Sequence, residues 1–148
     1  MAPGAFLLVL GLTAAVVGCS SDGDRAAGCA TVRAAEDTGA LTRTLDLADL
    51  GVTTAAEDRP GLSTVTVVSR RSIDDLLPLL RTRLDRAGYE RLGEDDEGFE
   101  AEIYLARGAD TYGLVRLRED QECDGRTNLQ VAVSTKAADS NTPSPAST

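Results

Sequence analysis

The alternation of apolar and charged side chains over residues 99–118 constrains the fold more strongly than any other feature of the chain. Two stretches, 99–107 and 111–118, repeat with the period of two that is typical of β-strands with one buried face. If residues 108–110 form a three-residue connection, the apolar positions of the two strands face each other, whereas a two-residue loop would mix the two faces. The sequence therefore predicts an antiparallel hairpin with these pairs: Ile103 with Val115, Ala101 with Leu117, Glu102 with Arg116, and Glu100 with Arg118.

Three further segments carry clear secondary-structure patterns. Residues 63–69 are rich in β-branched side chains, and residues 127–134 alternate apolar and polar positions, so both are predicted to be strands. Residues 72–88 place their leucines at helical spacing. Ser72, followed by Asp75, is typical of a helix N-cap, and Gly88 is typical of a helix end.

These elements predict an α+β domain over residues 29–135. It has two layers, with one helix packed on a mostly antiparallel four-stranded sheet in the order β-α-β-β-β. Residues 30–60 show neither clean helical nor strand spacing, so short helical turns and loop are expected there. The acidic segment 93–98 is expected to be a solvated loop, and the Pro/Ser/Thr-rich end, 136–148, a disordered tail.

An apolar run of about 14 residues, Ala5–Gly18, precedes the first cysteine. The run is too short to cross a bilayer, which takes roughly 20 residues. It has the length of the apolar region of a signal peptide, although no Lys or Arg precedes it. A lipoprotein signal, ordinary secretion and a buried apolar helix are the three interpretations of such a run.

The four residues Val16-Val17-Gly18-Cys19 at the end of this run resemble the lipobox of bacterial lipoproteins. In that family the cysteine thiol is alkylated by diacylglycerol, and a peptidase cuts the chain just before it. The resemblance implies a signal peptide over residues 1–18, a lipidated Cys19, a polar tether up to residue 28, and anchoring to the outer face of the cytoplasmic membrane. Lys136 is the only lysine beside many arginines, and this usage suggests a high-GC genome such as that of an actinobacterium.

The two remaining cysteines, Cys29 and Cys123, are predicted to form a disulfide, because an even pair in a small exported domain usually does so. Such a bridge would join the start of the domain to a late loop. A metal site is the poorer interpretation, since two thiols without histidine or a C-x-x-C spacing do not make one.

Composition excludes several classes of function. The chain has 15 Lys and Arg against 24 Asp and Glu, a formal net charge of −9, and no histidine. An acidic surface repels nucleic acid phosphates, and the commonest general base and metal ligand is missing. We expect no nucleic-acid partner and no cofactor. The predicted role is a non-catalytic binding or accessory module at the cell envelope, with an envelope protein as a candidate partner.

Two alternatives to a purely accessory role depend on acidic residues in the segment 93–98. Asp95, Asp96 and Glu97 are candidate ligands of a loosely held divalent cation in a cation- or small-ligand-binding protein, although their spacing matches no EF-hand loop. The same carboxylates would have to carry the chemistry of a histidine-free hydrolase. A solvated loop is the simpler interpretation.

The expected solvent-exposed face of the hairpin carries a third candidate feature. Its few large apolar side chains could contact a partner protein, or they could be isolated exposed residues of no special role. This candidate interaction patch consists of Tyr104, Tyr112 and Leu114.

Overall fold

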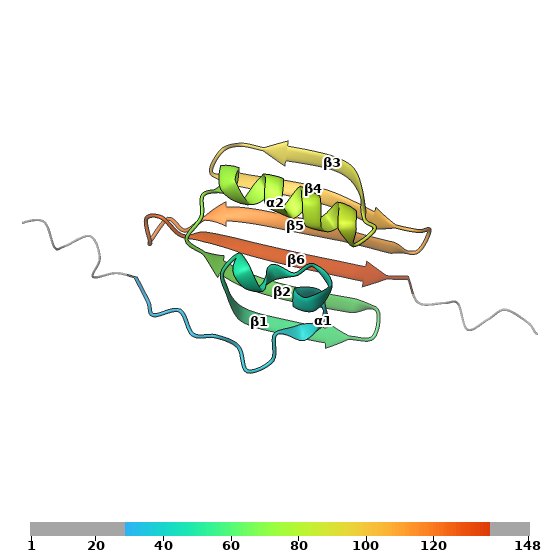
Figure 1. Ribbon diagram of the computed structural model, residues 1–148, viewed down its shortest axis with the longest axis horizontal. Helices are drawn as coiled ribbons and strands as arrows, with labels where there is room; N and C mark the ends of the chain where they lie inside the picture. Colours follow the sequence, from blue (N-terminus) through green and yellow to red (C-terminus); the bar gives the residue numbers. More distant parts are fainter. Residues whose placement is uncertain (1–28, 137–148) are drawn as a thin grey trace, which may run out of the picture.

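The computed structural model describes residues 29–136 as one antiparallel sheet with two helices and a 3-10 turn (Figure 1). The predicted signal peptide, Cys19, the tether up to residue 28 and the tail from residue 137 lie outside the described residues. In chain order the elements are α1 (Gly39–Thr44), η1 (Leu47–Asp49), β1 (Val52–Arg59), β2 (Leu62–Ser69), α2 (Ile73–Arg86), β3 (Glu90–Asp96), β4 (Glu100–Arg107), β5 (Thr111–Glu119) and β6 (Thr127–Thr135).

The sheet has six strands in the order β1-β2-β6-β5-β4-β3, so the prediction of four strands is wrong. The hairpin of β4 and β5 has the predicted register. Ile103 pairs with Val115 and Glu102 with Arg116, on opposite faces of the sheet. β6 lies between β2 and β5, and it joins the two halves of the chain at the centre of the sheet.

Both strands that the prediction missed lie at the edges of the sheet. Every residue of β3 is exposed, and in β1 only Thr53 is buried. The pairing register of each of these strands also shifts once, between Thr53 and Ala55 in β1 and between Arg91 and Gly93 in β3. A charged, irregular edge strand resists pairing with other chains. Such a strand buries no continuous face, so its sequence lacks the alternation by which strands are predicted.

One face of the sheet carries the hydrophobic core. The apolar face of α2, including Leu76, Leu80 and Leu84, packs into one cluster with buried strand residues such as Ile103 and Leu117. Ser72 caps the helix by accepting a hydrogen bond from the Asp75 N–H at 3.2 Å, as predicted. Alternate positions of β4, β5 and β6 lie on the opposite face and are half-buried or exposed, apart from Ala106.

The prediction of a single packed helix is also wrong. Figure 1 shows α1 and η1 beside the β1–β2 side of the sheet, on the face that α2 also covers. Their leucines complete the core there. Arg83 of α2 links the two helical segments on this face through its ion pair with Asp49 of η1, at 2.7 Å. The leucines of the α1–η1 segment that belong to the core are Leu41, Leu45, Leu47 and Leu50.

Candidate functional site

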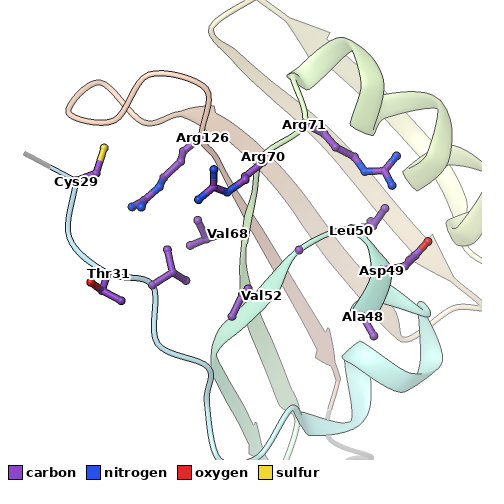
Figure 2. A pocket seen from close by; sticks show the side chains of 12 residues that line it. Cys29, Thr31, Ala48, Asp49, Leu50, Val52, Val68, Arg70, Arg71 and Arg126 are labelled. Carbon is purple, nitrogen blue, oxygen red and sulfur yellow. The ribbon is translucent and has the colours of Figure 1, made fainter. Parts of the chain in front are cut away.

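A groove of about 670 Å³ opens where β1 begins and β2 ends. Four stretches of chain line it: residues 29–32, residues 48–52, residues 68–71, and Arg126. We call it the arginine groove, because Arg70, Arg71 and Arg126 are its cationic residues (Figure 2). Its volume lies within the range of typical small-ligand sites.

Two buried hydroxyl groups fix the turn that carries Arg70 and Arg71. The Ser69 hydroxyl donates to the Leu50 carbonyl at 2.6 Å and accepts from the Arg71 N–H at 3.1 Å. The Thr127 hydroxyl donates to the Arg71 carbonyl at 2.8 Å. Ser69 and Thr127 are almost completely buried, and buried hydroxyls need such partners. The position of the two arginine backbones is therefore set by the interior of the domain.

The outer wall of the groove is held by the predicted disulfide. Cys29 and Cys123 are bonded, with their Cα atoms 5.3 Å apart, so this prediction is confirmed. Arg126 Nη1 donates to the Ala30 carbonyl at 2.9 Å. Further along, the Ala35 N–H donates to the Thr53 carbonyl of β1 at 2.8 Å. The first residues of the domain, 29–35, are therefore held at one end by the disulfide and the Arg126 hydrogen bond, and at the other end by the hydrogen bond to β1.

The arginine side chains divide the groove into two parts. In Figure 2 the guanidinium groups of Arg70 and Arg126 lie on the Cys29 side, above Val68, while Arg71 points toward Asp49. Asp49 is the only acidic residue among those that line the groove. Its pKa is lowered, chiefly by the hydrogen bond from Arg83 and further by the charge of Arg71. The only carboxylate of the groove is therefore already neutralised by a neighbouring arginine.

The Cys29 side of the groove is consequently cationic. Among residues 29–136, no ion pair involves Arg70, Arg71 or Arg126. Guanidinium groups donate several hydrogen bonds in a fixed plane and bind carboxylates and phosphates well. The apolar side chains of Val52 and Val68 lie beside them. This arrangement can hold an anion that has an apolar part.

Sequence reasoning missed these arginines as a site. In the sequence, Arg70 and Arg71 are simply the two residues that follow the predicted strand 63–69. A usable signal was nevertheless present, because Arg126 follows Cys123 by three residues and the predicted disulfide brings Cys29 to the same place. The pairing of Ser69 with Thr127 then places Arg70 beside Arg126, and this register was not predicted.

Of the three acidic candidates, Asp95 and Glu97 line one hollow together with Glu100 and Glu102, whereas Asp96 does not line it. Asp95 pairs with Glu102 and Asp96 with Ala101, so consecutive carboxylates point to opposite faces of β3. Both are exposed, as is Glu97. In the part of the chain that the structure describes, no three His, Cys, Asp or Glu side chains could together hold a metal ion. No Asp or Glu side chain within residues 29–136 is buried, so this part of the chain has no desolvated carboxylate of the kind that a hydrolase uses.

The residues of the candidate interaction patch do lie together. Tyr104 pairs directly with Leu114, and Tyr112 lies two positions before Leu114 on the same face. Tyr104 and Tyr112 are 46% and 51% exposed. Each hydroxyl already donates locally, Tyr104 to Glu102 at 2.6 Å and Tyr112 to the Ala109 carbonyl at 3.2 Å. A role in binding a partner stays a prediction.

Comparison with known proteins adds no functional assignment. The chain matches no protein-family model, no curated protein and no solved structure. Over residues 29–136, no helix is long and apolar enough to cross a membrane.

Proposed function

We propose that this protein is an exported lipoprotein, anchored through Cys19 to the outer face of the cytoplasmic membrane, and that its domain is a non-catalytic module that binds an anion in the arginine groove. The observation that carries the binding proposal is the pair of guanidinium groups, Arg70 and Arg126. They line one groove and form no ion pair within residues 29–136, although the chain has a net charge of −9. A cationic recess on an acidic protein favours an anionic ligand.

Two features support export and anchoring. The apolar run that ends at Cys19 has the pattern of a lipoprotein signal. The Cys29–Cys123 disulfide fits an oxidising compartment, because such bridges are rare in the cytosol. Acyl chains on Cys19 would then hold the protein at the membrane.

Replacing the anchoring thiol tests this location. In the Cys19→Ser variant we expect most of the protein to leave the membrane fraction, because no thiol remains at residue 19 to receive a lipid. Cell fractionation followed by mass spectrometry of the N-terminal peptide measures both distribution and acylation. Retention equal to that of the unaltered chain would show that the proposed anchor is wrong.

Stability measurements test the anion site. Ligand at ten times its dissociation constant stabilises a folded protein by about 1.4 kcal/mol. For a domain of this size, that corresponds to a rise in Tm of about 5–10 °C. We expect millimolar phosphate, at constant ionic strength, to raise the Tm of the purified protein in this way. The rise should be lost in Arg70→Gln, whose side chain is exposed and makes no ion pair within the described chain.

A matched variant controls for charge alone. Arg86→Gln removes the same charge at the far end of α2, about 20 Å from the end that follows the groove, given the rise of a 14-residue helix. This variant should keep the full response to phosphate. Equal responses in Arg70→Gln and Arg86→Gln would contradict the proposed site.

A further inference from the structure

We infer that the anion held in the arginine groove is the phosphate of an anionic phospholipid in the anchoring membrane, so that the groove faces the bilayer. This inference rests on the proposed function and names its ligand. Three observations carry it: where the tether joins the domain, how the charge is distributed, and what lies beside the arginines.

The tether enters the domain at the rim of the groove. Cys29 lines the groove and is fixed to Cys123 by the disulfide. Cys29 lies only ten residues after Cys19, and a fully extended chain of that length spans at most about 35 Å. A chain anchored at Cys19 therefore keeps the rim of the groove within about 35 Å of the membrane.

Charge favours the same orientation. An anionic bilayer repels a protein with a net charge of −9. Arg70, Arg71 and Arg126 offset part of this repulsion when they face the bilayer, since Asp49 is the only acid that lines their groove. The acids nearest to Arg126 in sequence, Asp120, Glu122 and Asp124, belong to the β5–β6 loop and do not line the groove. Each arginine near an anionic surface strengthens binding by about fivefold. The cationic groove and the tether junction thus lie on the same side of the domain.

The lining of the groove matches a lipid headgroup better than a free phosphate ion. Arg70 and Arg126 offer guanidinium donors suited to a phosphate. Val32, Val52 and Val68 add an apolar lining that a phosphate ion would leave uncovered. A phospholipid supplies both an anionic phosphate for the arginines and, next to it, glycerol and acyl carbon atoms for the valines. The groove, at about 670 Å³, also has room for more than the phosphate alone.

Arginine-specific modification tests this inference on the acylated full-length product. The protein is reconstituted into vesicles of phosphatidylglycerol or of phosphatidylcholine, treated with phenylglyoxal, and analysed by mass spectrometry. We expect Arg70 and Arg126 to react at least about fivefold more slowly in phosphatidylglycerol. Arg59, at the β1–β2 turn, and Arg86, at the end of α2, should react equally in both.

A third sample distinguishes the lipid from soluble phosphate. It contains phosphatidylcholine vesicles with inorganic phosphate at the concentration of the lipid phosphate in the first sample. If inorganic phosphate protects Arg70 as well as phosphatidylglycerol does, the lipid assignment is wrong and the proposed anion site stands. Equal reactivity in all three samples overturns the inference. Protection of Arg59 and Arg86 to the same degree also overturns it, because the contact would then not be specific to the groove.

The Arg70→Gln variant tests whether the protection of Arg126 depends on the groove. In Arg70→Gln we expect Arg126 to lose most of its protection by phosphatidylglycerol, whereas Arg86→Gln should leave it unchanged. Persistent protection of Arg126 in Arg70→Gln would overturn the inference. Fractionation of Cys19→Ser reports separately on the anchor, so its failure is not confused with failure of the lipid contact.

Discussion

Replacing Cys29 and Cys123 together by serine should lower the free energy of unfolding by about 4 kcal/mol. The two cysteines are 94 residues apart, so the bridge removes much of the freedom of the unfolded chain. A loss of this size is a large part of the total stability of a small domain. Denaturant titration of the variant and the unaltered protein measures it directly, and the Tm should fall by more than about 15 °C.

The same variant should also weaken the arginine groove. Without the bridge, the hydrogen bond from Arg126 to Ala30 is the nearest contact that holds the start of the domain against the β5–β6 loop. We expect the Tm response to phosphate to fall with the stability. Cys19→Ser is the matched control, because Cys19 lies outside the disulfide, and it should leave both quantities unchanged. If the free energy of unfolding falls by less than about 1 kcal/mol, residues 29–32 are held in the wall of the groove without the disulfide.

The register of β4 and β5 was predictable for a specific physical reason. Each strand has one buried and one exposed face, so a shift of one residue would bury charges such as Glu102 and expose residues such as Ile103. Of the two-residue and three-residue loops, only the three-residue loop avoids this. Alternation of buried and exposed positions on both strands therefore decides between these two loops, and the structure has the pairing of the three-residue loop.

The sequences of the edge strands β1 and β3, and of α1 and η1, lack such a regular alternation of buried and exposed positions. β3 buries none of its side chains, so nothing in its sequence distinguishes it from a solvated acidic loop. The leucines of α1 and η1 fit no single period, because Asp46 adopts a left-handed conformation with φ 51° between the two elements. Leu41 and Leu45 therefore belong to one helical turn, and Leu47 and Leu50 to the next.

The candidate site could be predicted only in part. The disulfide follows from the cysteine count and the expected export of the chain, and it places the start of the domain near Arg126. Arg70 lies beside Arg126 only because β2 pairs with β6, with Ser69 opposite Thr127. Those two strands are separated in sequence by α2 and three strands. Whether they are adjacent in the sheet therefore depends on the order of all six strands.

Gly51→Ala should destabilise the domain by about 3 kcal/mol, because β1 begins in close contact with the end of β2. A Cβ atom at residue 51 would lie 2.3 Å from the Val68 carbonyl oxygen and 2.8 Å from the carbonyl carbon. Both are backbone atoms, so the clash cannot be relieved by turning a side chain. Separation of the two strands is the remaining way to relieve it, and thermal and denaturant unfolding measure its cost.

Gly93→Ala is the matched control for Gly51→Ala. A Cβ atom at residue 93 would approach nothing closer than the Tyr104 ring, at 3.8 Å, which is an ordinary contact. This variant should change the free energy of unfolding by less than about 1 kcal/mol. Because Gly51 and Val68 both line the arginine groove, Gly51→Ala should also reduce the Tm response to phosphate, whereas Gly93→Ala should preserve it. Equal stability of the two variants would contradict the close approach of β1 to β2 on which the shape of the groove depends.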